Sequence, residues 1–163
     1  YEHLKLLRNH GLVDRDNVRI CGYNSRLDTF QAVVGNWIIP SATKIANQRI
    51  RNAKYFDKNL EKIKEISIPP RIKNFKIVYH LYIVFVENRD ELLKYCLKKG
   101  IEAKVHYPIP MYRQPAMNFL KHKKSDFPVS ERHAKSIISF PCDQHLSKKE
   151  QDYIISTVRN FYK

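Results

Sequence analysis

The strongest constraint on the fold is a helical spacing of apolar residues between positions 27 and 60, which a proline interrupts. Its first part follows intervals of three and four residues, typical of one buried stripe of an α-helix, at Leu27, Phe30, Val34 and Ile38. Pro40 stops or kinks this helix because proline lacks a backbone N–H and its ring clashes with the preceding turn. Ser41 can cap a second helix, whose apolar side is formed by Ala46, Ile50, Ala53, Phe56 and Leu60. The spacing therefore predicts a long bent connector helix.

The segments after Pro69 and Pro70 alternate between strand and helix patterns. Strands are expected at 76–86, at 101–107 and near Phe140. Helices are expected at 88–97, 128–138 and 147–161, the first capped by Asn88 and the last by Ser147. Gly100 is expected to end the first of these helices in the left-handed conformation. This order predicts a small α/β or α+β domain, a sheet covered by helices, whereas residues 1–26 are expected to be irregular.

The charge balance is compatible with an anionic ligand but does not by itself decide the function. The 163 residues contain 30 Lys and Arg against 16 Asp and Glu, a formal net charge of +14. Such a surface favours polyanions or phosphorylated small molecules. A basic nucleic-acid-binding module is therefore one hypothesis, although the sequence carries no zinc finger, helix-turn-helix or RNP-type motif. The basic residues are spread along the chain, which is more typical of solvated faces.

The cysteines and the apolar runs limit the compartment. There are three cysteines, an odd number, and no CxxC spacing, so neither a disulfide framework nor a structural metal site is expected. No apolar run approaches the ~20 residues needed to cross a bilayer. We therefore expect a cytoplasmic protein that binds no metal and does not enter a membrane.

Two polar clusters could bind a ligand. Asn24 and Arg26 follow the turn residue Gly22 and precede the first expected helix, an arrangement that suits recognition of a phosphate or carboxylate. His106 and Tyr107 stand at the end of an expected strand, next to two prolines. His and Tyr can donate hydrogen bonds to sugar or phosphate oxygens. Taken singly, each cluster is better explained as an ordinary turn or strand end.

Taken in order, the motifs resemble those of a known family. Four sets of residues carry the likeness: Leu7 to Gly11; Gly22, Tyr23, Asn24, Arg26, Gln31, Ala32 and Gly35; Gly100, Ile101, Val105 to Pro108, Pro110, Gln114 and Pro115; and Phe127, Pro128, Glu131, Ala134, Ser139 and Pro141. In order and spacing the chain resembles the C-terminal half of the DegT/DnrJ/EryC1/StrS aminotransferases. These are pyridoxal 5'-phosphate (PLP) enzymes of fold type I that act on nucleotide-linked keto-sugars.

The resemblance implies a homodimer with active sites at the subunit interface. It implies that Asn24 binds the phosphate of the partner subunit's PLP and that Arg26 lies near the same cofactor or its substrate. It also implies that His106 and Tyr107, with Tyr23 as a further candidate, line the pocket for the nucleotide-diphosphate keto-sugar. Residues 1–40 would be a remnant of the large cofactor-binding domain and the start of the connector helix. Residues 41–163 would form the rest of the connector and the small domain.

The implied reaction transfers an amino group from glutamate to the keto-sugar, as in amino-sugar or polysaccharide biosynthesis. In this family the lysine that holds PLP as a Schiff base lies upstream of the position of Tyr1. We therefore expect no catalytic residue within this chain, and no transamination by the chain alone. The segment Asn24 to Thr29 favours members that aminate C3 of a 3-keto sugar. A PLP-dependent sugar dehydratase is the alternative within the family.

Overall fold

The computed structural model describes all 163 residues and divides them into two compact units, Tyr1–Ala42 and Thr43–Lys163. The first unit contains helices α1 (Glu2–Arg8) and α2 (Thr29–Ile38) and the 3-10 turn η1 (Ile39–Ser41). The expectation that residues 1–26 are irregular is wrong for residues 2–8. Glu2 in the first turn of α1, and Lys5 and Arg8 in its last, complement the helix dipole.

Helix α2 begins with a capping box that the sequence analysis did not identify. The Asp28 carboxylate accepts the Gln31 backbone N–H at 2.8 Å, and the Gln31 side-chain oxygen accepts the Asp28 N–H at 3.4 Å. The apolar stripe of α2 is not buried, because α2 contains no buried residue. Phe30 is 78% exposed and Trp37 is 80% exposed. The helical periodicity is therefore confirmed, and the apolar stripe of this helix is exposed within this chain.

The connector is confirmed as a run of three consecutive helical elements. Pro40 lies in the 3-10 turn η1, which joins α2 directly to helix α3 (Ala42–Leu60). Ala53, Phe56 and Leu60 of α3 are fully buried, as the apolar spacing predicts. The face that they form is part of the hydrophobic core of the second unit.

The second unit holds a three-stranded antiparallel sheet in the order β1–β2–β3. Its strands are β1 (Ile66–Ser67), β2 (Tyr82–Val86) and β3 (Ile137–Phe140). Tyr82 pairs with Phe140, and Ile66 pairs with Val86. Tyr82, Val84 and Val86 are buried while the residues between them are half-buried, so β2 presents alternate side chains to the core. Strand β3 confirms the short strand that was expected near Phe140.

One expected strand is shorter than predicted and another is absent. Residues 76–81 are not part of β2, because Tyr79 has a φ of 51° that no strand adopts and β1 is too short to pair with them. Residues 101–107 form no strand; only Lys104 pairs with a strand residue, Ser139, through two backbone hydrogen bonds of 3.0 and 2.8 Å.

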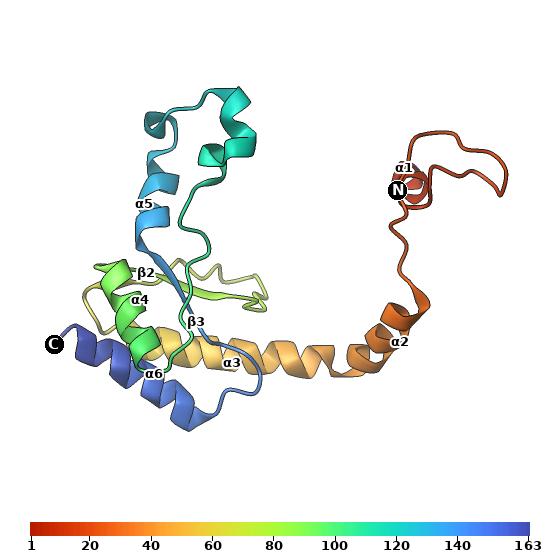
Figure 1. The fold of residues 1–163 in the computed structure, drawn as a ribbon. Coiled ribbons are helices and arrows are strands. Elements are labelled where there is room, and N and C mark those ends of the chain that lie inside the picture. The colour runs from red at the N-terminus through yellow and green to blue at the C-terminus, as the bar shows by residue number, and fades with distance from the viewer. The chain divides into compact units, whose positions relative to one another are not determined.

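Three helices complete the second unit: α4 (Arg89–Lys98), α5 (Pro128–Ser136) and α6 (Lys148–Phe161). Around the sheet, α4 packs against α6, and α5 contacts β2 (Figure 1). The capping box of Ser147 and Glu150 and the left-handed Gly100 are confirmed. The expected cap by Asn88 is wrong, because Asn88 is itself left-handed and its side chain bonds no backbone N–H of the helix. Helix α5 ends two residues earlier than expected, where β3 begins.

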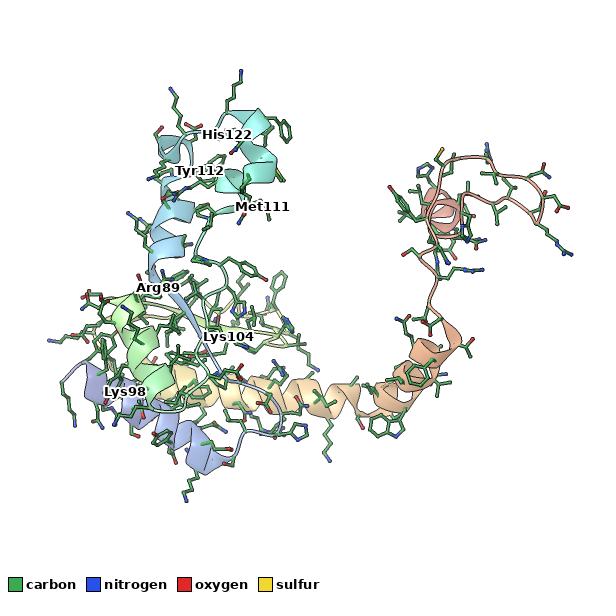
Figure 2. The ribbon with its side chains drawn as sticks, viewed as in Figure 1. Arg89, Lys98, Lys104, Met111, Tyr112 and His122 are labelled. Atoms are coloured by element: carbon green, nitrogen blue, oxygen red, sulfur yellow. The ribbon has the colours of Figure 1, made fainter.

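The segment between Tyr107 and Phe127 extends away from the sheet (Figure 1) and contains only 3-10 turns. These turns are η2 (Met111–Arg113), η3 (Pro115–Leu120) and η4 (Lys124–Asp126). The buried Arg89 guanidinium stabilises the junction from which α5 and β3 start, donating to the carbonyls of Ala134 and Ile137 at 3.2 Å each (Figure 2). The extended segment is therefore attached to a firmly held base.

The three cysteines are all free and differ in exposure. Cys21 is exposed, whereas Cys96 and Cys142 are buried. Burial raises the pKa of the Cys96 thiol to about 11 and that of the Cys142 thiol to about 12. None of the helices combines the length and the apolar character needed to cross a membrane.

Candidate functional site

The segment that carries Tyr23, Asn24 and Arg26 is hydrogen-bonded to the end of α1 and the residues after it. The Tyr23 N–H donates to the Leu7 carbonyl at 2.7 Å, and the His10 N–H donates to the Tyr23 carbonyl at 2.9 Å. The Ser25 N–H donates to the Arg8 carbonyl at 2.9 Å. Two of the sequence motifs, Leu7 to Gly11 and Gly22 to Arg26, are thus two sides of one local structure.

Two glycines make this close pairing possible. A Cβ at Gly22 would overlap the backbone nitrogen of Gly11 and would lie 2.7 Å from the His10 carbonyl carbon. Gly11 has a φ of 77°, and a Cβ there would overlap the carbonyl of Ile20. These glycines are therefore more than markers of flexible turns, because each is required by a backbone that passes directly against it.

Asn24 and Arg26 form a pair of hydrogen-bond donors on this rigid turn. The Arg26 Nε donates to the Asn24 Oδ1 at 3.3 Å. That bond occupies the one acceptor of the Asn24 side chain, and it leaves the Asn24 amide N–H groups and the two terminal Arg26 nitrogens to donate outward. Both side chains are exposed, as is Tyr23 beside them. An array of N–H donors with one positive charge suits a phosphate group.

His106 and Tyr107 lie in the second unit, where the extended segment leaves the sheet. The two rings meet edge to face with centroids 5.4 Å apart. His106 Nδ1 is 2.9 Å from the hydroxyl oxygen of Ser139, a buried residue of β3. Tyr107 is 71% exposed, so its hydroxyl is available to a ligand.

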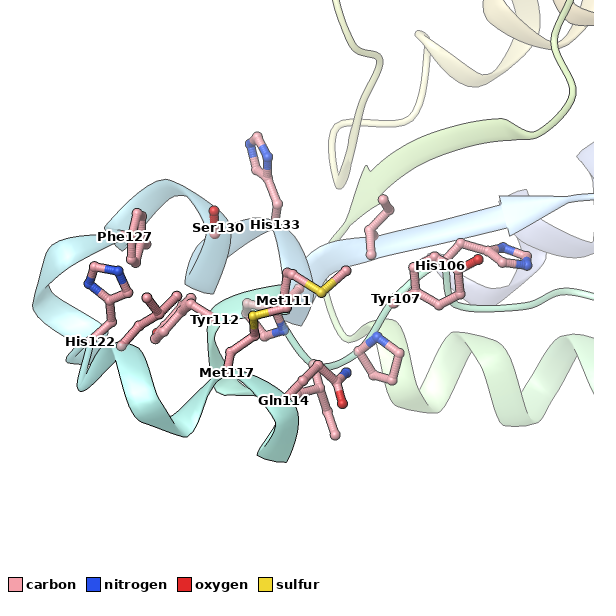
Figure 3. Close-up of a pocket in the computed structure, with 16 residues that line it drawn as sticks. His106, Tyr107, Met111, Tyr112, Gln114, Met117, His122, Phe127, Ser130 and His133 are labelled. Atoms are coloured by element: carbon pink, nitrogen blue, oxygen red, sulfur yellow. The ribbon is translucent and has the colours of Figure 1, made fainter. Parts of the chain in front are cut away.

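An open cavity of about 840 Å³ extends from His106 and Tyr107 along the extended segment. Its lining is mainly apolar, with Met111, Met117 and Phe127 among the contributors. Figure 3 shows His106 and Tyr107 at one end of the cavity and His122 and Phe127 at the other. A volume of this size accommodates a ligand of several rings.

The far wall of the cavity is held by a contact between η2 and α5. The Tyr112 hydroxyl donates to the Glu131 carboxylate at 2.5 Å, and Arg113 Nη1 donates to the same oxygen at 3.4 Å. The bond from Tyr112 is the main cause that lowers the pKa of Glu131 below its ordinary value. Desolvation, followed by the bond to Glu131, raises the pKa of Tyr112 to about 12. Tyr112 therefore stays protonated and keeps donating at neutral pH.

The predicted site residues fall into two groups. Tyr23, Asn24 and Arg26 lie together in the first unit, and His106 and Tyr107 lie together in the second. Ser139 and Glu131 belong to the sequence motifs given above, but no role follows for them from the sequence alone. They contact residues 33 and 19 positions away, respectively, which no local pattern reveals. The one signal in the sequence was the position of Ser139, a polar motif residue next to the strand expected near Phe140.

Comparison with known proteins identifies relatives over nearly the whole chain. A model of the DegT/DnrJ/EryC1/StrS aminotransferase family matches residues 1–159. The dTDP-3-amino-3,6-dideoxy-alpha-D-galactopyranose transaminase of Aneurinibacillus thermoaerophilus is 32% identical, over 98% of this chain and 43% of that protein. The dTDP-3-amino-3,4,6-trideoxy-alpha-D-glucose transaminase of Streptomyces venezuelae is 29% identical, over 98% of this chain and 42% of that protein.

Solved structures agree with this result. The crystal structure of S. venezuelae DesV in complex with a ketimine intermediate matches with a TM-score of 0.94 and 29% identity, over 99% of this chain and 44% of that one. The expected mixed helix and sheet fold is thereby confirmed. The chain spans less than half the length of the relatives it matches. With a family match over residues 1–159, the chain belongs to the DegT/DnrJ/EryC1/StrS aminotransferase family.

Proposed function

We propose that this chain is the C-terminal portion of a PLP-dependent aminotransferase that transfers an amino group from glutamate to a nucleotide-linked keto-sugar. The observation that carries the proposal is the donor pair of Asn24 and Arg26, fixed on a turn that two glycines hold in place. Membership of the family supports the same reaction class over the alternative of a nucleic-acid-binding module.

The residues of the first unit fit the phosphate end of PLP. Asn24 would donate its amide N–H groups to the phosphate of the partner subunit's cofactor, and Arg26 would neutralise part of its charge. Because the backbone bonds at Tyr23 and Ser25 hold the turn, these donors need little reorganisation when the phosphate arrives. When bound, PLP supplies an electron sink for moving an amino group.

The residues of the second unit fit the sugar nucleotide. His106 and Tyr107 place one ring N–H or N and one hydroxyl at the end of a mainly apolar cavity, so they can orient the sugar or its diphosphate. Two relatives are named as transaminases of 3-amino sugars, which supports a 3-keto sugar as the substrate. Glutamate as donor and a homodimer as the active form complete the proposal.

The reaction is best tested on the polypeptide encoded by the whole reading frame that contains these residues. Purified with PLP, it should release 2-oxoglutarate from glutamate in the presence of a dTDP- or UDP-linked 3-keto sugar. A product that has lost water and gained no nitrogen would instead identify the dehydratase. Binding of generic DNA with a steep salt dependence, and no effect of sugar nucleotides, would favour the nucleic-acid-binding module.

The role of Asn24 across the dimer can be separated from a role within one subunit. An Asn24→Ala variant should lose PLP during gel filtration, whereas Arg15→Ala, which changes another exposed arginine of the first unit, should retain it. Asn24→Ala should regain activity when its subunits are mixed with those of a variant that lacks the Schiff-base lysine. Each mixed dimer then has one site that contains both the Schiff-base lysine of one subunit and Asn24 of the other. No recovery in mixed dimers would contradict the proposed exchange between subunits.

A further inference from the structure

Ser139 is a buried polar residue at a position where three segments meet. It is 4% exposed, it pairs with Ile83 of β2, and its backbone exchanges two hydrogen bonds with Lys104. Its neighbours in β3, Ile138 and Phe140, are core residues. A side chain at this position is therefore held by the sheet on one side and by the segment that leads to His106 on the other.

The Ser139 hydroxyl has a single hydrogen-bond partner in the structure, His106 Nδ1 at 2.9 Å. If Nδ1 carried the proton, Nδ1–H would donate to Oγ, and the Ser139 O–H would be left buried without an acceptor. An unsatisfied buried donor destabilises the folded state, because it has lost its bonds to water without gaining a replacement. If Ser139 donates to an unprotonated Nδ1, both groups are satisfied. The proton of the neutral imidazole then resides on Nε2.

We propose that Ser139 is a positioning residue that fixes the ring of His106 and holds its proton on Nε2. Since Nδ1 is occupied by Ser139, Nε2 is the ring nitrogen left free for a ligand that reaches His106. His106 is then a hydrogen-bond donor toward an oxygen atom. Combined with the proposed function, on which this last step rests, the acceptor is an oxygen of the nucleotide-linked sugar or its diphosphate.

The tautomer can be measured on the 163-residue chain without any ligand. In ¹⁵N-labelled chain at a pH where the histidines are neutral, long-range ¹H–¹⁵N correlation distinguishes a protonated Nε2 from a protonated Nδ1. A His106→Asn variant assigns the signal among the seven histidines. We expect the Nε2–H form for His106 in the unaltered chain. An Nδ1–H form would overturn the proposal, and this result needs no substitution at Ser139.

Substitutions then test whether Ser139 is the cause. Ser139→Ala should convert the single tautomer into a mixture, whereas Ser139→Thr, which keeps the hydroxyl, should preserve it. Ser136→Ala is the matched control, because the Ser136 hydroxyl bonds only the Arg132 carbonyl of its own helix. If Ser139→Ala folds and His106 keeps the same tautomer, Ser139 is not a positioning residue.

In the longer enzyme the same variants separate binding from folding. Ser139→Ala should raise KM for the sugar nucleotide about tenfold, which corresponds to about 1.4 kcal/mol, with a smaller change in kcat. Ser139→Thr should restore KM. An unchanged KM together with the expected tautomer shift would confine the failure to the proposed function and leave the inference about Ser139 intact.

Discussion

Gly22 and Gly35 are both glycines, yet an added methyl group would meet different surroundings at each. At Gly22 the methyl carbon would lie within the backbone of residues 10 and 11, which cannot move without breaking the bonds that hold Tyr23. At Gly35, inside α2, nothing lies within 4 Å. The same substitution therefore has opposite expected effects at the two positions.

Gly22→Ala should disrupt the turn that presents Asn24 and Arg26. Overpacking of this kind costs about 1–3 kcal/mol or more, and here the clash is with backbone. Hydrogen exchange of the Tyr23 and Ser25 amides should become at least about tenfold faster. Gly35→Ala should leave these amides unchanged and stabilise α2 by about 0.5–1 kcal/mol, because alanine has the higher helix propensity. Equal exchange rates in Gly22→Ala and the unaltered chain would contradict the assigned role of Gly22.

Among the helices, α3 carries one buried polar side chain in addition to its apolar face. Asn52 is 2% exposed; its Nδ2 donates to the Asp143 carbonyl at 2.7 Å, and its Oδ1 accepts from Gln48 at 2.9 Å and from Gln151 at 3.2 Å. Asn52 therefore links α3 to α6 and to the loop before it. Removing it takes one partner from the buried Gln151 amide and one from the half-buried Asp143 carbonyl.

Asn52→Ala should lower the free energy of unfolding of the second unit by about 1–3 kcal/mol, measured by urea denaturation. Asn59→Ala is the control on the same helix, because the Asn59 side chain is only half-buried and bonds the Tyr55 carbonyl one turn earlier. That change should stay within about 0.5 kcal/mol. A similar loss in both variants would mean that the contacts of Asn52 with α6 contribute little.

Helix α5 and turn η2 are coupled through Glu131, and this coupling depends on pH. The pKa of Glu131 is lowered in the folded chain, so its stabilising contribution is present above the ordinary value of 4.5 and is lost as the pH falls through the lower, folded value. The ring signals of Tyr112 should therefore shift on acidification, with a midpoint below 4.5, in NMR spectra. Glu131→Gln should abolish that shift, and the exposed Tyr23 should show none in either protein. A Tyr112 shift with a midpoint at or above 4.5 would contradict the coupling.

The elements that the sequence predicted well are those whose determinants are local. The apolar spacing of α3, the capping box at Ser147 and the left-handed Gly100 each depend on residues within a few positions. Strand lengths failed because they depend on partners: residues 76–81 have the composition of a strand but no strand to pair with. The two groups of candidate site residues could be proposed from motifs, but the contact of Ser139 with His106 required the folded sheet.

At the scale of the whole molecule, helix α2 of the first unit adds a large exposed apolar surface. Helix α2 carries Phe30, Val33 and Trp37, all more than 60% exposed, and it has no buried residue. Contiguous apolar patches of this kind are uncommon on monomeric proteins. The chain also spans less than half the length of its relatives.

We therefore predict that the 163-residue chain, prepared by itself, associates with itself. Light scattering should give an average mass that rises with concentration. A variant with Phe30→Ser and Trp37→Ser should reduce this association, while a change of Tyr153, which is half-exposed on α6, to Ser should not. A monodisperse monomer over the whole concentration range would contradict the prediction.

The different exposure of the three cysteines makes one position selectively reactive. A maleimide dye requires an accessible thiol that can ionise. Burial makes the thiols of Cys96 and Cys142 inaccessible and raises their pKa values, so neither should react. Cys21 is the accessible one, three positions before Asn24 along the chain. The natural sequence would thus accept a single fluorophore beside the proposed phosphate-binding turn, and the arrival of PLP or inorganic phosphate could be followed optically without replacing any residue.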